Sequence, residues 1–269
     1  MLLARKSLGQ HWLRDEVALR QIVQAANLKS DDTVLEIGPG PGTLTRYLVA
    51  KAKKVVAVEL DHNLAIQLPQ RLPAANLKVV EGDVLKFNLT KLPLDYKVVA
   101  NIPYYLTAKL LRIFTETTNP PKLLVLLVQK EVAERICAGP GRMSLLSVSV
   151  QIKYEVQQGP ILPAKRFIPV PKVDSQVVIL KKRTRPLFRG LDEKKFFQIV
   201  RAGFSQRRKK LRSSLSGGLR LPKTEVDQLL NSADINGDLR PESLTLEQWY
   251  KLYSEYLAKK DLGSLLRLR

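Results

Sequence analysis

Short apolar runs alternate with amphipathic stretches from about residue 30 to residue 130. The apolar runs cover residues 33–37, 55–59, 77–81, 96–100 and 123–129. Helical spacing follows the first two runs, at about 43–51 and 62–71. Runs of Val, Leu and Ile separated by helices are typical of parallel strands that are buried on both faces. The pattern therefore predicts an α/β fold with a parallel sheet.

The pattern changes after about residue 180. The basic segment 181–186, with the sequence KKRTRP, predicts a hinge. No strand-like run follows it, and helical spacing returns at 196–205, 224–232 and 246–257. We therefore predict two domains, an α/β domain over residues 1–182 and a smaller all-helical domain over residues 183–269.

The charge of the chain points to a class of partner. The 269 residues include 45 Lys+Arg and 25 Asp+Glu, for a formal net charge of +20. A hydrophobic content of 45% is ordinary for a globular protein, so the charge does not indicate disorder. Nucleic acid is the first candidate for a polyanionic partner, and an anionic membrane surface is the second. Residues 181–220 contain 14 Lys+Arg and 2 acidic residues, which is more than half of the excess.

Scarce cysteine and histidine exclude several kinds of site. One cysteine, Cys137, leaves no internal disulfide and no cysteine-cluster zinc site. Two histidines, His11 and His62, cannot form a multi-histidine site, and we predict that no metal is bound. The longest purely apolar run, 123–128, is too short to span a membrane, and the first twenty residues lack the apolar core of a signal peptide. We therefore expect a soluble cytoplasmic protein.

A glycine-rich turn with the sequence EIGPGPG, at residues 36–42, lies between the first predicted strand and the helix after it. Glycines at such a junction let the backbone approach a ligand closely. A dinucleotide site would have the spacing G-x-G-x-x-G, but here the third glycine comes one position early, at Gly42. The observed spacing favours S-adenosylmethionine (SAM), and a turn that only caps the helix is the alternative.

Two acidic residues end the next two predicted strands. Glu59 lies 21 residues beyond Gly38, where a carboxylate can accept hydrogen bonds from both ribose hydroxyls of a cofactor. A surface charge shared with Asp61 is the alternative. Asp83 could accept from the adenine amine of the same cofactor, although a helix-cap or turn role explains it nearly as well. With the glycine loop, these acids predict a SAM site.

The sequence Asn101-Ile102-Pro103-Tyr104 follows the fourth predicted strand. Methylating the exocyclic amine of a base is difficult because its lone pair is delocalised into the ring. An amide oxygen and a nearby carbonyl, such as Asn101 Oδ1 and the Ile102 carbonyl, can each accept an N–H and make the nitrogen more nucleophilic. Pro103 restricts the turn, and Tyr104 supplies a flat face for the base.

With these motifs the sequence resembles the ribosomal RNA adenine dimethyltransferases of the small subunit, the kasugamycin-sensitivity enzymes. The erythromycin-resistance methylases are close relatives. Further matching segments in the family's order are KSLGQH at 6–11, VQKEVA at 128–133, FIPVPKVDS at 167–175, FSQRRK at 204–209 and RPESL at 240–244. The resemblance covers nearly the whole chain. It implies a Rossmann-like, SAM-dependent methyltransferase sheet with a smaller all-helical C-terminal domain.

The resemblance also implies roles for individual residues. The implied cofactor-binding residues are His11, Leu13, Gly38, Gly40, Glu59, Asp83 and Asn101. The implied catalytic residues are Asn101, Tyr104 and Phe167. Of these, Asn101 would lie between the cofactor and the target base. Tyr104 and Phe167 would be the two aromatic walls that clamp a flipped adenine, although packing in the core is the simpler explanation of Phe167 taken alone.

The implied reaction is the dimethylation of N6 on two adjacent adenosines in the loop of the 3′-terminal hairpin of 16S ribosomal RNA. S-adenosylhomocysteine would be the by-product, and a monomeric enzyme would act on an immature 30S particle during small-subunit biogenesis. Two alternatives stay open. One is a non-catalytic RNA-binding assembly factor, and the other is a large-subunit adenine methylase of the erythromycin-resistance type.

The densest basic cluster predicts where RNA is bound. Its members are Arg201, Arg207, Arg208, Lys209, Lys210 and Arg212. A run of charges often marks only a solvated surface, but five cations in six positions of a protein at +20 favour contact with phosphates.

The chain departs from the family pattern at a few positions near these motifs. Trp12 replaces the usual Phe, a change expected to affect packing only. Tyr105 and the pair 108–109 replace the residues common after the Asn-x-Pro-Tyr motif, and the segment 142–144 is unusual. These departures leave the detailed shape of the target-base pocket open.

Overall fold

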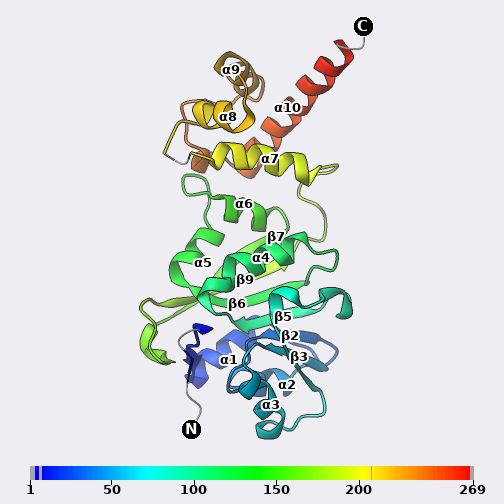
Figure 1. Ribbon diagram of the computed structural model, residues 1–269, viewed down its shortest axis with the longest axis vertical. Helices are drawn as coiled ribbons and strands as arrows, with labels where there is room; N and C mark the ends of the chain where they lie inside the picture. The colour runs from blue at the N-terminus through cyan, green and yellow to red at the C-terminus, as the bar shows by residue number, and fades with distance from the viewer. Residues whose placement is uncertain (1–3, 6–7, 207, 267–269) are drawn as a thin grey trace. The chain divides into compact units, whose positions relative to one another are not determined.

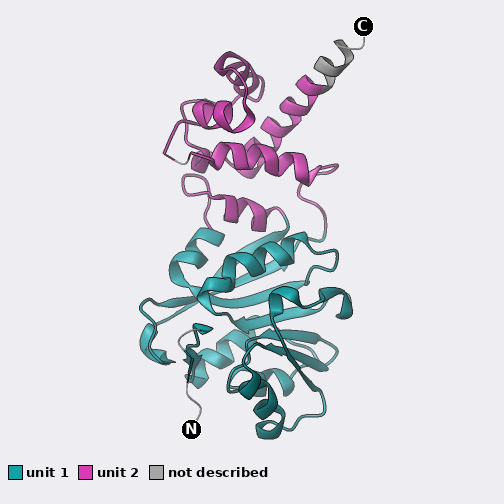
Figure 2. Cartoon of the chain, viewed as in Figure 1, with its two compact units in different colours: residues 1–137, 153–184 teal, residues 138–152, 185–269 magenta. Residues whose placement is uncertain are grey.

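The chain divides into two compact units in the computed structural model, which describes residues 4–5, 8–206 and 208–266 (Figure 2). Residues 1–137 and 153–184 form the first unit, and residues 138–152 and 185–269 form the second. The second unit is therefore discontinuous, whereas the sequence predicted a single boundary at 182/183. The difference has a packing cause, because Met143, Val148 and Ile152 lie in the hydrophobic core of the helical unit.

The first unit is built on a seven-stranded sheet with the order β4-β3-β2-β5-β6-β9-β7 (Figure 1). Its strands are β2 (Thr33–Ile37), β3 (Lys54–Glu59), β4 (Leu77–Glu81), β5 (Lys97–Asn101), β6 (Leu123–Gln129), β7 (Tyr154–Leu162) and β9 (Ser175–Lys182). Strands β2 to β6 pair in parallel, and β9 runs antiparallel to both β6 and β7. The predicted α/β fold is confirmed, and the strands β9 and β7 extend the parallel sheet at one edge through antiparallel pairings. A separate two-stranded sheet pairs β1 (Trp12–Leu13) with β8 (Phe167–Ile168).

Helices cover the large sheet on both faces. They are α1 (Glu16–Ala25), α2 (Thr45–Val49), α3 (His62–Arg71), α4 (Thr107–Glu116) and α5 (Lys130–Ile136), with the short 3-10 helices η2 (Val84–Lys86), η3 (Leu89–Lys91), η4 (Tyr104–Leu106) and η5 (Ala164–Arg166). Successive side chains of a strand point to opposite faces, and four consecutive residues of β3, 55–58, are each at most 5% exposed. Such burial requires cover on both sides of the strand.

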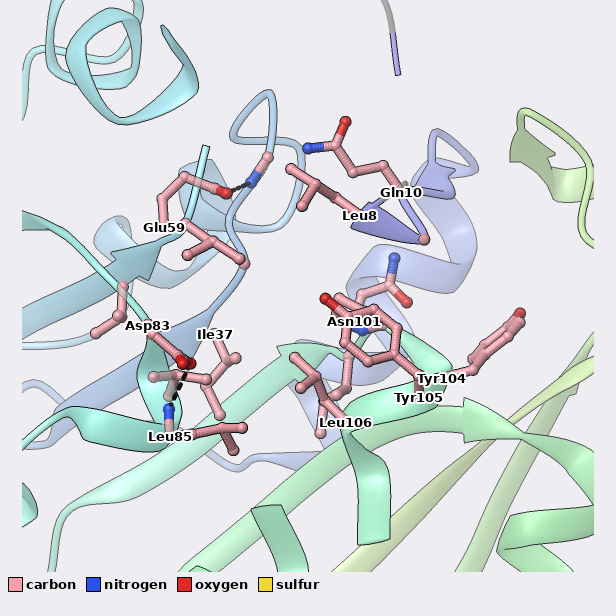
Figure 3. Close-up of a pocket in the computed structure, with 18 of the residues that line it drawn as sticks. Leu8, Gln10, Ile37, Glu59, Asp83, Leu85, Asn101, Tyr104, Tyr105 and Leu106 are labelled. Carbon is pink, nitrogen blue, oxygen red and sulfur yellow. Dashed lines mark hydrogen bonds between the residues drawn. The ribbon is translucent and has the colours of Figure 1, made fainter. Parts of the chain in front are cut away.

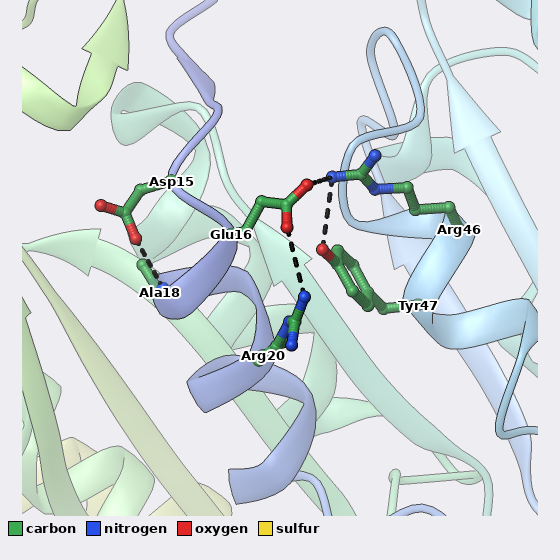
Figure 4. A network of polar contacts seen from close by, with 6 residues as sticks. All are labelled: Asp15, Glu16, Ala18, Arg20, Arg46 and Tyr47. Atoms are coloured by element: carbon green, nitrogen blue, oxygen red, sulfur yellow. Dashed lines mark hydrogen bonds and ion pairs between the residues drawn. The ribbon is translucent and has the colours of Figure 1, made fainter.

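Helix α1 begins after a gap of two residues from the end of β1, with Asp15 as its N-cap. Asp15 caps it by accepting a hydrogen bond from the Ala18 N–H at 2.8 Å (Figure 4). Glu16 then accepts from Arg46 of α2 at 3.0 Å and from Arg20 at 3.2 Å. Exposed ion pairs of this kind add little stability, so the buried face of α1 supplies most of its attachment.

The second unit contains no strand in its described residues, in agreement with the helical spacing seen in the sequence. Its helices are α6 (Leu145–Gln151), α7 (Glu193–Phe204), α8 (Leu211–Leu219), α9 (Lys223–Ser232), η6 (Pro241–Ser243) and α10 (Leu246–Leu266). Trp249 is fully buried at the centre of their core. Helices α7 and α8 pack so closely that a Cβ atom on Gly218 would lie 2.5 Å from Ala202 Cα.

Candidate active site

A cavity of about 230 Å³ lies at the carboxyl ends of the parallel strands of the first unit (Figure 3). The ends of β2, β3 and β5 and the residues that follow β4 form its walls, and residues 8–12 line it from the N-terminal segment. The strand order reverses between β2 and β5, since β3 lies on one side of β2 and β5 on the other. Open α/β sheets bind ligands at such a point of reversal.

The glycine loop leaves room for a ligand in this cavity. Gly38 has a φ of +62°, and a Cβ atom added to it would meet only Pro103 Cδ, at 3.9 Å. A side chain at residue 38 would therefore occupy the cavity itself. At Gly40, with a φ of +56°, a Cβ atom would lie 3.2 Å from Trp12 Nε1, so the absence of a side chain lets the indole pack against the loop.

Glu59 presents its carboxylate to the cavity from the end of β3. One oxygen accepts from the Gly40 N–H and the other from the Asp61 N–H, each at 2.9 Å. Burial raises the pKa of Glu59, and the backbone N–H donors of Asp61 and Gly40 partly offset that rise by favouring the charged form. Each carboxylate oxygen can accept more than one hydrogen bond, so both keep capacity for the hydroxyls of a ribose.

Asp83 both caps a helix and lines the cavity. Its Oδ1 accepts from the Leu85 N–H at 2.9 Å and caps η2, while the residue also lines the cavity (Figure 3). The cap uses one carboxylate oxygen. The second is left for a donor such as an adenine amine.

Asn101 ends β5 with its amide in a defined orientation. Its Nδ2 donates to the backbone carbonyl of His11 at 3.0 Å. Because a carbonyl oxygen can only accept, the amide nitrogen must face His11, and Oδ1 is left as an acceptor. The Ile102 N–H donates to the Leu127 carbonyl at 3.3 Å, which attaches the Asn-x-Pro-Tyr turn to β6.

Tyr104 stacks on His11 in this structure. Their ring centroids are 5.9 Å apart and their planes differ by 19°. The Tyr104 hydroxyl is 2.8 Å from Ser175 Oγ, and burial raises the Tyr104 pKa although the Ser175 contact opposes the rise. His11 Nδ1 lies 2.7 Å from the Pro169 carbonyl, so Nδ1 carries the hydrogen and donates it. The stacking contact and one hydrogen bond therefore position each ring, with Ser175 bonded to Tyr104 and the Pro169 carbonyl bonded to His11.

Leu13 and Phe167 are not brought to the cavity. They pair with each other across β1 and β8, and their side chains are 1% and 0% exposed in the core of the first unit. The structure thus gives the Phe167 ring a packing position, the simpler of the two explanations weighed for it. Other predicted site residues do converge on the cavity, namely His11, Gly38, Gly40, Glu59, Asp83, Asn101 and Tyr104.

Three departures from the family pattern also line the cavity: Trp12, Tyr105 and Lys109. Trp12 is 6% exposed and packs on Gly40, so it contacts the glycine loop as well as the core. Tyr105 is 53% exposed and approaches Gly9, where an added Cβ atom would lie 3.2 Å from the Tyr105 ring. The position of all three at the cavity could have been predicted from the sequence, because each lies close to one of the motifs described above.

Glu36 lies behind the glycine loop and is 1% exposed. Burial raises the pKa of Glu36 to about 8, and the nearby charge of Glu59 adds to the rise. A neutral Glu36 at pH 7 avoids placing a second charge next to Glu59.

The predicted RNA-binding cations of the second unit differ in their surroundings. Lys210 and Arg212 both contact Asp238, at 3.3 and 2.9 Å. No ion pair is recorded for Arg201, Arg208 or Lys209 within the described residues, and all three are exposed. Arg207 lies outside the described residues.

Two features are absent from the part of the chain that the structure describes. None of the helices there contains an apolar stretch of the length that a membrane span requires. The same residues include no group of three or more His, Cys, Asp or Glu side chains that could hold a metal ion.

Comparison with known proteins adds independent information. The profile of the family described as "Ribosomal RNA adenine dimethylase" matches residues 1–259. A protein named "Ribosomal RNA small subunit methyltransferase A" from Dehalococcoides mccartyi strain 195 is 41% identical over 259 residues, covering 95% of this chain and 89% of the relative. The protein of that name from Crocosphaera subtropica is 40% identical, covering 95% and 98%.

Solved structures agree with this result. A dimethyladenosine transferase from Plasmodium falciparum has a TM-score of 0.81 and 28% identity, covering 93% of this chain and 98% of the other. The 23S rRNA methyltransferase ErmE has a TM-score of 0.75 and 30% identity, covering 91% and 98%. The match extends over both units, and the chain therefore belongs to the ribosomal RNA adenine dimethylase family.

Proposed function

We propose that this chain dimethylates N6 of two adjacent adenosines in the loop of the 3′-terminal hairpin of 16S ribosomal RNA, using SAM. We further propose that it does so in the cytoplasm, as a monomer acting on an immature 30S particle. The observation that carries the proposal is the orientation of Asn101. Its Nδ2 is occupied by the His11 carbonyl, which leaves Oδ1 as an acceptor at the edge of a cavity suited to an adenosine-containing cofactor.

The residues around the cavity fit SAM. Gly38 leaves space that a side chain would fill, Glu59 can accept from the ribose hydroxyls, and the second oxygen of Asp83 can accept from the adenine amine. SAM, when bound, supplies an electrophilic methyl group.

The chain itself must position and activate the target amine. Asn101 Oδ1 and the Ile102 carbonyl accept hydrogen bonds from the two N–H groups of N6, which reduces delocalisation of its lone pair. Tyr104 offers a flat face on which the flipped base can stack, an interaction of about 1–3 kcal/mol. After the first methylation one N–H is left, so only one of the two acceptors still binds it. The second transfer then depends on room for the methyl group already present.

Replacing Glu59 by alanine is expected to raise the dissociation constant of SAM by about tenfold or more. The reason is that charged hydrogen bonds contribute about 1.5–3 kcal/mol each, and the variant loses those to the ribose. Isothermal titration calorimetry would measure the change. Glu81→Ala, an exposed acid at the end of the neighbouring strand β4, is the matched control and should bind SAM as the parent does. An unchanged constant in the Glu59 variant would refute the ribose contact.

Joint replacement of Arg201, Arg208 and Lys209 by alanine is expected to weaken RNA binding and to reduce its dependence on salt. Each lost phosphate contact should lower the log–log salt slope by about 0.7–0.9. Replacing Lys210 and Arg212 should change the slope less per residue, because Asp238 already partly neutralises both. Fluorescence anisotropy over a KCl series measures both effects. Equal slopes for the parent and the triple variant would place the RNA contact elsewhere.

The two alternatives can be weighed against the same observations. A large-subunit methylase is favoured by the likeness to ErmE, but its 30% identity is lower than the 41% identity to a small-subunit relative. A purely structural assembly factor would have no need of an acceptor oriented as Asn101 Oδ1 is. An assembly role and catalysis can also coexist in one protein.

The direct test uses isotopically labelled SAM and immature small ribosomal subunits, followed by mapping of the modified nucleotides. We expect two dimethylated adenosines in the 3′-terminal hairpin loop. Label in 23S RNA alone would support the large-subunit alternative, and no label with either particle would contradict the proposal.

A further inference from the structure

A second cavity, of about 90 Å³, lies in the first unit. It is lined by Thr33 at the start of β2, by Lys54 and Val56 of β3 and by Lys78 and Val80 of β4, whereas the active-site cavity lies at the carboxyl ends of the strands. Lys54 of the second cavity and Glu59 of the first lie at opposite ends of β3, but Val80 of the second cavity pairs with Val58 of the first. The two cavities are therefore neighbours on the same sheet, and no residue lines both.

The second cavity has an apolar floor and one aromatic wall. Lys78 pairs with Val56 across β3 and β4, and Val80 pairs with Val58, so side chains from both strands share one face of the sheet. Val56 and Val80 contribute the floor. The wall comes from the segment around η3 and includes Phe87, whose side chain is half-buried.

Three lysines surround this apolar floor. Lys54, Lys78 and Lys91 are exposed and line the cavity, and no carboxylate residue lines it with them. Across the residues that the structure describes, none of the three forms a recorded ion pair. By contrast, Lys97 and Lys122 of the same unit both contact Asp32 at 2.8 Å. The cavity thus concentrates positive charge that no neighbouring side chain neutralises.

We propose that this cavity is a second RNA-contact site, which takes one unpaired nucleotide of the substrate RNA. The base would stack on Phe87, and the flanking phosphates would contact Lys54, Lys78 and Lys91. An aromatic face combined with unneutralised cations is the chemistry by which proteins bind single-stranded nucleic acid. The inference rests on the proposed function, since it requires an RNA substrate.

The position of the second cavity has a consequence for the substrate. The cavity contains no residue of β5, the strand that Asn101 ends, so a nucleotide bound in it is a different one from the adenine that faces Asn101. Binding at two linked places raises the effective concentration of each contact, so an RNA that reaches both cavities should bind more tightly than one that reaches only the active site.

The test compares three variants by anisotropy with fluorescent small-subunit RNA over a KCl series. Joint replacement of Lys54, Lys78 and Lys91 by alanine should weaken binding at least tenfold and lower the salt slope by about two. The matched control replaces Lys51, Lys53 and Lys86, which are exposed near the same strands but do not line the cavity. It removes the same charge and should have a clearly smaller effect.

Phe87→Leu should weaken RNA binding about tenfold while leaving the salt slope unchanged, because it removes stacking and no charge. Unfolding midpoints would show whether the variant is folded. Equal effects of the two lysine triples would indicate a diffuse basic surface and would overturn the proposal, as would unchanged RNA binding in all three variants. Cavity variants that lose binding of inorganic phosphate but bind RNA as the parent does would assign the cavity to a small anion and would overturn the proposal.

Failure of this proposal and failure of the proposed function are distinguishable. SAM binding and methylation of the mapped adenosines by the parent protein test the function. In the cavity variants SAM affinity should stay unchanged, since no residue altered there lines the active-site cavity. A parent protein that methylates RNA, together with cavity variants that bind RNA as the parent does, would reject the second site alone.

Discussion

Asn101→Ala is expected to lower the rate of methyl transfer by about 10²–10³-fold, the usual cost of removing one preorganised polar contact to the reacting group. The variant loses Oδ1, the acceptor that the His11 contact leaves available. Single-turnover methylation of RNA at saturating SAM would measure the rate. SAM affinity should change by less than about tenfold, because Glu59 and Asp83 keep their positions in the cavity.

Asn101 also has a structural contact that this variant removes. Asn101 Nδ2 also holds the backbone of His11, so the variant could shift the N-terminal segment. The stacking of His11 on Tyr104 would then change as well, and calorimetry with SAM would detect a loss of cofactor contacts. Asn63→Ala, the same change at an exposed position of α3, is the control and should leave both measurements unaltered. Equal losses of SAM affinity and of rate in Asn101→Ala would contradict the assigned role.

The largest expected effect on stability comes from Asp32, at the opposite end of the sheet. Asp32 accepts from Lys97 and Lys122, both at 2.8 Å, and from the Lys29 N–H at 2.7 Å. The Lys97 side chain is only 8% exposed, so Asp32→Asn leaves a buried ammonium without its carboxylate. We expect the free energy of unfolding of the first unit to fall by about 3–5 kcal/mol.

Urea unfolding followed by tryptophan fluorescence in a Trp249→Phe background would measure this loss, because the remaining Trp12 belongs to the first unit and is buried in it. Glu116→Gln, which breaks the exposed Arg112 pair, should cost at most about 1 kcal/mol. Adding Lys97→Met to Asp32→Asn should recover part of the loss, since it removes the buried charge. No recovery in the double variant would show that the carboxylate acts through Lys29 or Lys122 instead.

The carboxyl group of Asp32 also predicts that the free energy of unfolding depends on pH. Burial by itself would raise the pKa of Asp32, but Lys122, Lys97 and the Lys29 N–H outweigh it and bring the pKa to about 2, below the ordinary value of 3.8. A carboxyl with a lowered folded pKa stabilises the protein fully above its unfolded pKa, and this contribution disappears as the pH falls through 2. Asp32→Asn should therefore have a flatter stability profile between pH 4 and pH 2. A profile parallel to that of the parent would contradict the pairing.

Elements with strong local patterns were predictable from the sequence. The runs at 33–37, 77–81 and 123–129 are strands with those bounds, and residues 62–71 form helix α3. Strand β7 was not predicted, because it lies at the sheet edge, has several exposed positions and contains Gly159. Strand order and the placement of β9 between β6 and β7 depend on contacts between distant residues, which periodicity does not report.

Helix α8 was missed for a different reason. It contains Gly217 and Gly218, which lower helix propensity, and it begins at the basic cluster that was interpreted as a binding surface. The helix forms because Leu211 and Leu215 are fully buried and because Gly218 allows close packing on α7. Tertiary contact here outweighs local preference.

The candidate site was predictable where a residue follows a strand. Glu59, Asp83 and Asn101 could be placed at one edge because the carboxyl ends of parallel strands meet there. The contributions of His11 and Trp12 could not be derived in this way, since they depend on how the N-terminal segment packs on the sheet. The burial of Phe167 depends on its pairing with β1, a contact across more than 150 residues.

The helical unit is discontinuous in sequence, and this limits the positions at which the chain can be truncated. A fragment that ends at residue 184 would expose the apolar side chains around α6, and a fragment of residues 185–269 would lack Met143, Val148 and Ile152 from its core. During synthesis, α6 is also made before the C-terminal helices against which its residues pack. Truncation studies of RNA binding should therefore transplant residues 138–152 together with the C-terminal helices, or replace the segment in the first unit by a short polar loop.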